Sequence, residues 1–190
     1  QDSGIISEIV LVVPEKEYES AYVDWLGQPV IVKKVVVGGE KRQDSVFNGV
    51  SEVSQDTEIV LVHDGVRPFL SSKMISESVD AARKYGAAIT AIPVADTIKR
   101  VDSSGLVFET IDREGLWRVQ TPQAFRFSLL QEAFAKAKSV NFYGTDEGAL
   151  IEHLGKPVKI VEGSEQNIKI TRPEDLDLCE IFASKVFPEV

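Results

Sequence analysis

EIVLVHDGVRPFLSSKMISESVDAARKYGAAITAIP, at residues 58–93, carries the pattern from which the fold class follows. An apolar run at 59–62 leads into a helix-like segment at 71–85, and a second apolar run follows at 87–92 before Pro93. Runs that are apolar along their whole length are typical of strands in a sheet that helices cover on both faces. The stretch therefore predicts a buried strand, a helix and a second buried strand.

The same alternation extends on both sides of this stretch. Strands are expected at 5–13, 30–37 and 158–161, and helices at 15–26, 41–53, 127–138, 145–154 and 173–186. Strands that alternate with helices over short connections are typical of a parallel sheet. We therefore predict an α/β fold, with a doubly wound and mostly parallel sheet of the Rossmann-like type, in a single domain over residues 1–190.

The alternation breaks at about residues 96–120. Residues 97–101 and 106–110 surround a Ser-Ser-Gly turn at 103–105, which predicts a β-hairpin whose strands are amphipathic. An inserted hairpin of this kind would protrude from the domain unless its apolar side found a partner, and a second copy of the chain is the natural one. We therefore expect a protruding β-arm that makes the protein a homodimer.

Composition narrows the possible partners. The 190 residues carry a formal net charge of −9, which repels nucleic acid but leaves room for a small phosphorylated ligand held by a local cluster of Arg and Lys. No apolar run approaches the roughly 20 residues of a membrane helix, and the N-terminus has no signal-peptide pattern. The single cysteine, Cys179, suits a reducing compartment. We expect a cytoplasmic protein without nucleic-acid or membrane partners.

Charged residues follow the predicted strand at 59–62. Asp64 and Arg67 come directly after it, where ligands bind in open α/β sheets. An Asp at this place can hold a divalent metal ion and an Arg can hold a phosphate, although a local salt bridge would explain the pair equally well. Two glycines at 38–39 join another strand to a helix whose first turn carries Arg42 and Ser45, which suits an anion or a base edge but also an ordinary capped turn.

Five further positions are candidates, each with a structural alternative. Thr97 begins the hairpin and Arg113 lies at its far side, where charges can also simply protect a sheet edge. Thr121 belongs to a Thr-Pro-Gln segment that reads as a rigid turn, and Thr145 reads first as a helix cap. Lys169 stands between apolar neighbours on an expected half-buried strand, so it either reaches a pocket or extends along the surface to solvent.

Six segments in the same order resemble the 2-C-methyl-D-erythritol 4-phosphate cytidylyltransferases of the non-mevalonate isoprenoid pathway. They are GGEKRQDSVFNGV, VHDGVRPF, ADTIKR, DREGLWRVQTPQAF, TDEGALIEHLG and NIKITRPEDL, and they span residues 38–176. The resemblance implies a nucleotidyltransferase fold with a dimerising β-arm. It also implies a Mg²⁺-dependent reaction of CTP with methylerythritol phosphate that gives 4-diphosphocytidyl-2-C-methyl-D-erythritol and pyrophosphate.

The same resemblance assigns roles to individual residues. It implies that Asp64, Lys169 and Arg67 form the reaction centre, with Asp64 as the metal ligand. CTP would be bound by Gly39, Glu40, Arg42, Ser45, Asp64 and Gly65. The sugar phosphate would be bound by Thr97, Arg113, Thr121, Thr145, Arg67 and Lys169, of which Thr97 and Arg113 come from the arm of the neighbouring subunit.

One departure and two rival functions accompany this resemblance. The family begins with a strand and a glycine-rich loop that grip the triphosphate, and residues 1–37 do not match them, so we expect these elements to be missing from this sequence. Ribitol 5-phosphate cytidylyltransferases share the glycine pair and the segments at 62–68 and 121–123, whereas 112–117 and 145–149 favour the methylerythritol enzymes. A non-catalytic nucleotide-binding relative is the other alternative.

Overall fold

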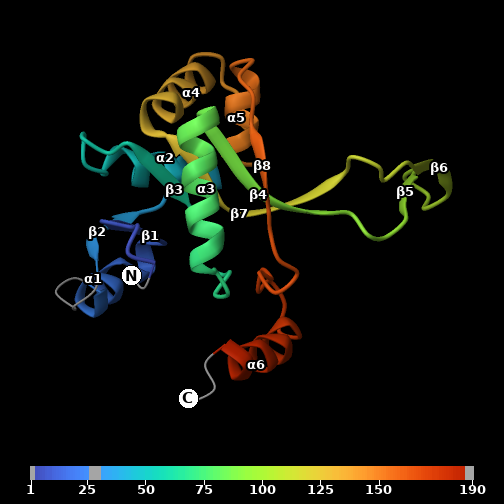
Figure 1. Ribbon diagram of the computed structural model, residues 1–190, viewed down its shortest axis with the longest axis horizontal. Coiled ribbons are helices and arrows are strands. Elements are labelled where there is room, and N and C mark those ends of the chain that lie inside the picture. The colour runs from blue at the N-terminus through green and yellow to red at the C-terminus, as the bar shows by residue number, and fades with distance from the viewer. Residues whose placement is uncertain (1–2, 26–30, 187–190) are drawn as a thin grey trace.

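The computed structural model of the chain describes residues 3–25 and 31–186. Its centre is a four-stranded sheet in the order β3 (Ile59–Val62), β7 (Trp117–Arg126), β4 (Ala87–Pro93) and β8 (Lys159–Glu162) (Figure 1). The α/β class is therefore confirmed.

The expectation of a mostly parallel sheet needs correction, because β7 runs antiparallel to both of its neighbours. Only β4 and β8 form a parallel pair in this sheet. The reason lies in the connection between β4 and β7. The chain leaves β4, makes the hairpin and returns directly beside β4, whereas a parallel neighbour would need a crossover, usually through a helix.

Helices cover both faces of the sheet. Ser78 of α3 (Ser72–Tyr85) lies 3.4 Å from the hydroxyl of Thr90, so Thr90 faces α3. The preceding residue, Ile89, packs against Gly148 of α5 (Glu147–His153). Because successive residues of a strand point to opposite faces, α3 and α5 lie on opposite sides of β4.

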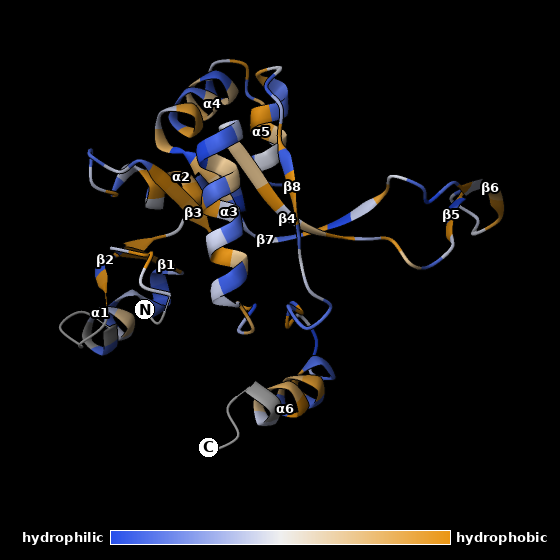
Figure 2. Ribbon diagram, viewed as in Figure 1, coloured by the Kyte–Doolittle hydropathy of each residue, from blue (hydrophilic) through white to orange (hydrophobic). Residues whose placement is uncertain are grey.

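The main hydrophobic core lies on the α5 side. Phe125 of β7 is fully buried there, with Leu130 and Phe134 of α4 (Phe127–Ser139) and Ile151 of α5. Figure 2 shows the apolar residues of the sheet beneath these helices. Burial of large side chains of this kind contributes about 1.5–3 kcal/mol each, so this core holds the strand ends that carry the site in place.

A second, two-stranded parallel sheet consists of β1 (Ile9–Val13) and β2 (Val32–Val37). Between them lie a short 3-10 turn at Glu15–Glu17 and α1 (Tyr18–Trp25), where a single helix at 15–26 was expected. Within the described ranges this sheet shares no strand pairing with the larger one, and a largely apolar open cleft of about 1440 Å³ separates β1 from β3. The helix α2 (Arg42–Ser51) contacts β1 and β2, and its Val50 belongs to the main core.

The expected hairpin consists of β5 (Ile98–Val101) and β6 (Val107–Ile111), which pair antiparallel with each other. In Figure 1 it lies to one side of the four-stranded sheet. Its strands are exposed on both faces, and the exposed residues include Val107 and Phe108. An antiparallel sheet that packs on a core normally has one buried face and one exposed face.

The last helix, α6 (Asp175–Val186), begins two residues after the expected start at 173, and its Phe182 packs edge-on against Phe69. None of the helices in the described part of the chain is both long and apolar enough to span a membrane.

Candidate active site

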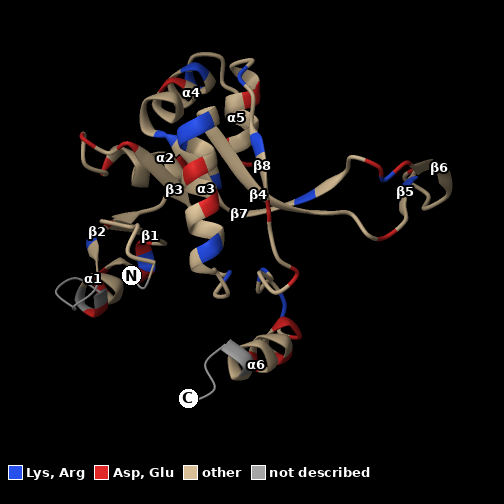
Figure 3. Cartoon of the chain, in the orientation of Figure 1, with Lys and Arg blue, Asp and Glu red and all other residues tan. Residues whose placement is uncertain are grey.

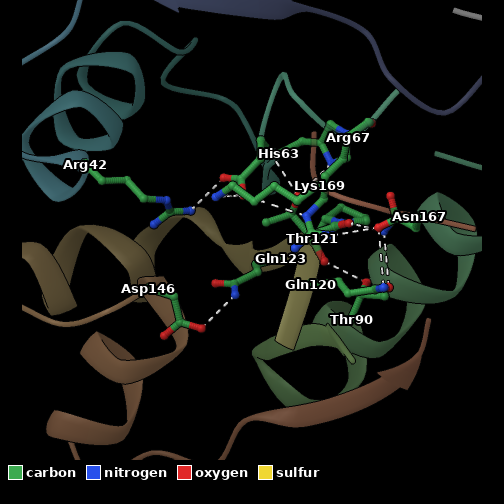
Figure 4. Close-up of polar contacts among 12 residues, drawn as sticks. Arg42, His63, Arg67, Thr90, Gln120, Thr121, Gln123, Asp146, Asn167 and Lys169 are labelled. Carbon is green, nitrogen blue, oxygen red and sulfur yellow. Dashed lines mark hydrogen bonds and ion pairs between the residues drawn. The ribbon is translucent and has the colours of Figure 1, made fainter. Parts of the chain in front are cut away.

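Three cationic side chains converge on Asp64, just beyond the carboxyl end of β3. Its Oδ2 lies 2.9 Å from Lys169 Nζ and 3.8 Å from Arg67 Nε, and its Oδ1 lies 3.4 Å from Arg42 Nη2. Figure 4 shows Arg42 and Lys169 reaching this point from different elements. The Asp64–Arg67 pair is local, as the salt-bridge alternative proposed, but Arg42 and Lys169 come from distant parts of the sequence.

The charges around Asp64 keep its carboxylate ionised. Burial alone raises its pKa, but the hydrogen bond from Lys169 and the charges of Arg42 and Arg67 lower it by more. The pKa of Asp64 is therefore below its usual value. Glu147 also pairs with Arg42, so the three cations face two carboxylates. The excess of positive charge suits a ligand that carries several phosphates.

His63 and Thr121 fix the backbone beside Asp64. His63 Nε2 lies 3.0 Å from the carbonyl oxygen of Arg67, which can only accept, so Nε2 carries the proton. Nδ1 then accepts from the Thr121 hydroxyl at 3.0 Å, and the same hydroxyl oxygen accepts from the backbone N–H of Asp64 at 3.0 Å. Burial lowers the pKa of His63, which favours this neutral ring.

The expectation that Thr121–Gln123 forms a turn is wrong, because these residues lie inside β7 and are buried. Pro122 is tolerated in a central strand because the register between β4 and β7 shifts there: Ile89 pairs with Gln123, but Ala91 pairs with Val119. Such irregularities are where a sheet accepts a residue without an N–H group. The strand instead places Thr121 beside His63.

Lys169 does not lie on a strand, contrary to expectation; its segment is irregular and follows β8. Two hydrogen bonds hold the segment to the Asp64 loop: the Arg67 side chain donates from Nη1 to the Asn167 carbonyl at 2.6 Å, and the backbone N–H of Ile170 donates to the Val66 carbonyl at 2.9 Å. The buried side chain of Asn167 donates to the carbonyl oxygen of Thr121 at 2.8 Å. These hydrogen bonds position Lys169 beside Asp64.

The glycine pair at 38–39 makes a tight turn between β2 and α2. Gly39 N donates to Ser45 Oγ at 3.0 Å, and a Cβ on Gly39 would overlap the Asp44 side chain. The residue type at position 39 is therefore required by packing. Glu40, in this turn, and Gly65, next to Asp64, are both exposed.

Thr145 is not the cap of α5, as had been expected. Asp146 is the cap, and its Oδ1 accepts from Ala149 N at 2.9 Å while Gln123 donates to its Oδ2 at 2.8 Å. Asp146 is the cap rather than Thr145 because its two carboxylate oxygens can accept both of these hydrogen bonds. Thr145 itself is exposed.

Thr97 directly precedes β5 and Arg113 follows β6, so both belong to the hairpin, which lies to one side of the four-stranded sheet (Figure 1). Both residues are exposed, and Arg113 Nη1 donates to the carbonyl oxygen of Ala95. Neither residue is among the hydrogen-bond and ion-pair partners of Asp64 in the described part of the chain.

Glu147 is the main site residue that the sequence interpretation missed. Its buried carboxylate lies 2.9 Å from Arg42 Nη1 through both oxygens. The only signal for it was a second acid directly after the capping Asp146, which is ordinarily explained by the helix dipole.

Asp64 is the candidate metal ligand at this centre, because its carboxylate lies among the three cations. Residues 3–25 and 31–186 contain no group of three or more His, Cys, Asp or Glu side chains placed to hold a metal ion by themselves. Mg²⁺, however, is commonly held by one or two carboxylates together with substrate phosphates and water. A single ionised Asp64 fits that ligand set once a triphosphate is bound.

Comparison with known proteins identifies the family. The family model for 2-C-methyl-D-erythritol 4-phosphate cytidylyltransferase, IspD, matches residues 1–185. Curated relatives of that name include one from Syntrophus aciditrophicus, 46% identical over 97% of this chain and 80% of the relative, and one from Geobacillus thermodenitrificans, 50% identical over 94% and 78%.

Solved structures agree with this match. The 4-diphosphocytidyl-2C-methyl-D-erythritol synthase of Anaerococcus prevotii superimposes with a TM-score of 0.84 at 34% identity, over 99% of this chain and 84% of that one. The cytidylyltransferase of Thermus thermophilus gives a TM-score of 0.81 at 33% identity, over 93% and 82%. This chain therefore belongs to the family of 2-C-methyl-D-erythritol 4-phosphate cytidylyltransferases.

Proposed function

We propose that the cluster around Asp64 is the centre at which this chain transfers a cytidylyl group from CTP to 2-C-methyl-D-erythritol 4-phosphate, the reaction of its family. The observation that carries this assignment is the convergence of Arg42, Arg67 and Lys169 on one ionised carboxylate. A phosphate oxygen of the sugar phosphate attacks the α-phosphorus of CTP, the bond from that phosphorus to the bridging oxygen breaks, and pyrophosphate leaves. The product is 4-diphosphocytidyl-2-C-methyl-D-erythritol.

Such a reaction needs positioning and charge neutralisation more than covalent help from the protein. Lys169 is suited to the phosphate that reacts, because its side chain is 42% exposed and can leave Asp64 to meet a ligand. Arg67 is more enclosed, at 11%, and is held by the Asn167 carbonyl, which suits a fixed binding group for the substrate phosphate.

The nucleotide would lie along the turn at 38–45. Gly39 and Glu40 would meet the cytosine edge, with Ser45 holding the turn through its bond to Gly39 N. Gly65 leaves space beside Asp64 for the triphosphate, since no atom lies within 4 Å of the place of a Cβ there. Mg²⁺, bound to Asp64 and the phosphates, would neutralise charge on the triphosphate.

The sugar phosphate would be held partly by a second subunit. Val101, Leu106, Val107 and Phe108 of the hairpin are 51%, 69%, 57% and 64% exposed, which favours a partner for this apolar surface. We propose that the hairpin is a dimerisation arm, and that its Thr97 and Arg113 reach the Asp64 centre of the partner subunit. Thr145 would contact the same substrate. The Thr121 hydroxyl already bonds His63 and Asp64, so its main part would be to position them.

A cytoplasmic location completes the proposal, in keeping with the single, free Cys179. Nucleic acid remains a poor partner for the chain as a whole, because its formal net charge is −9 and acidic side chains lie among the basic ones on α3 and the hairpin (Figure 3).

The test is pyrophosphate release by the full-length natural protein with CTP and Mg²⁺. Release is expected with methylerythritol phosphate and not with ribitol 5-phosphate. Release with ribitol 5-phosphate alone would keep the cytidylyl transfer and overturn the substrate. If neither substrate gives pyrophosphate, calorimetry with CTP and Mg²⁺ identifies a non-catalytic nucleotide-binding relative by tight binding without turnover.

A further inference from the structure

Glu147 is a buried acid for which the family resemblance gives no role. Its side chain is 1% exposed, and both carboxylate oxygens lie 2.9 Å from Arg42 Nη1. A carboxylate that is buried without a partner costs several kcal/mol, so it keeps its cation close. Burial raises the pKa of Glu147, and the charge of Arg42 and its hydrogen bond oppose that rise.

Arg42 uses its two terminal nitrogens for two different acids. Nη1 donates to Glu147, and Nη2 lies 3.4 Å from Asp64 Oδ1. The guanidinium is planar and rigid, so an acid that fixes Nη1 also fixes the direction of Nη2. Glu147 therefore controls how the Arg42 side chain faces the reaction centre.

The backbone of Arg42 is held separately. Gln43 Nε2 donates to the Phe142 carbonyl at 3.1 Å, and Gly144 N donates to Gln43 Oε1 at 2.9 Å. These two bonds join the first turn of α2 to the segment before α5. A change at Glu147 should therefore release the Arg42 side chain without moving the helix that carries it.

We propose that Glu147 is a positioning residue of the reaction centre, which aims the Arg42 guanidinium at Asp64 and at the phosphates that gather there. This inference rests on the proposed function, in which Arg42 binds CTP. Glu147 would not touch the substrate itself, and it would act only through Arg42.

A double-mutant cycle with E147Q and R42A tests this proposal. E147Q should lower kcat/KM for CTP about 10- to 100-fold, since small misplacements of a binding group cost this much. In the R42A background, E147Q should cause no further loss. E152Q is the matched control, because Glu152 is exposed on the same helix, and it should keep wild-type activity. If the loss of kcat/KM in the double variant equals the product of the losses in E147Q and R42A, the two residues act independently and the proposal is overturned. Melting temperatures show whether each variant folds.

A second measurement does not depend on activity. In ¹H–¹⁵N spectra of the arginine side chains, Arg42 should show separate, slowly exchanging Nη signals in the wild type and in E152Q, and these should be lost in E147Q. Persistence of the signals in E147Q would overturn the proposal. A wild type without pyrophosphate release would refute the proposed function instead, and the spectra would still decide whether Glu147 orients Arg42.

Discussion

Lys169 Nζ lies 2.9 Å from Asp64 Oδ2, although 105 residues separate them in the sequence. Neither residue could be assigned to the other from sequence spacing. The contact exists because the segment after β8 is bonded along the loop after β3, through the Asn167 and Val66 carbonyls. The pairing of these two segments creates the charged centre.

Replacing Asp64 by Asn should reduce turnover far more than CTP binding. The three cations remain, so affinity for CTP should persist, whereas the metal ligand is lost and kcat should fall roughly 100-fold or more. Steady-state kinetics and calorimetry with CTP separate the two effects. D80N, at an exposed position of α3, is the control. Unchanged turnover in D64N would remove Asp64 from the centre.

Replacing Arg113 by Ala should mainly raise KM for the sugar phosphate, by about 10-fold or more, the equivalent of one charged hydrogen bond. R100A, on the same hairpin, should have little effect. If Arg113 serves the partner subunit, mixing R113A with D64N subunits should restore part of the activity, because one of the two mixed sites then contains both native residues. The absence of recovery in verified mixed dimers would place the whole site in one subunit.

Replacing Thr121 by Val should destabilise the protein by about 1–3 kcal/mol, because the His63 ring and the Asp64 N–H would lose their buried partner. T121S keeps the hydroxyl and should cost clearly less. Denaturant unfolding measures both variants. Equal losses in the two would show that the methyl group matters rather than the hydroxyl. Turnover should also fall in T121V, since Asp64 loses its backbone support.

Asp175 should titrate below the usual value of about 3.9. Its Oδ2 accepts from Thr171 N at 2.8 Å and from Arg172 N at 2.9 Å, and these bonds lower its pKa. A lowered folded-state pKa means that the stabilisation is complete well above pH 3.9 and is lost as the pH falls through the folded-state value. Carboxyl NMR titration measures the pKa directly. A value at or above about 3.9 would contradict the prediction.

The D175N variant gives an independent check on the same turn. Amide exchange at Thr171 and Arg172 should become faster, because their common acceptor is weakened. D177N, also in the first turn of α6, should leave exchange at both amides unchanged. Equal acceleration in the two variants would mean that the turn is not held by Asp175.

Local sequence pattern predicted much of the fold. The apolar run at 59–62, the helix at 71–85 and the run at 87–92 correspond closely to β3, α3 and β4, and Ser71 caps α3 by accepting from Met74 N. The placement of Asp64 and Arg67 at the end of a strand followed from the same pattern. Hydrophobic periodicity, caps and turns depend on residues that are near in sequence, and this is why they could be read without a structure.

The sequence by itself thus determined the α/β class, the family resemblance and the strand end that carries Asp64. Only the tertiary structure decided that β7 runs antiparallel through the buried Thr121–Gln123 segment, that Gln123 bonds Asp146, and that Glu147 meets Arg42. Strand pairing and buried ion pairs join segments that lie tens of residues apart. Whether two such groups pair depends on how the fold positions them and on their removal from water together. That information is not contained in any local pattern, because it arises only when the chain is packed.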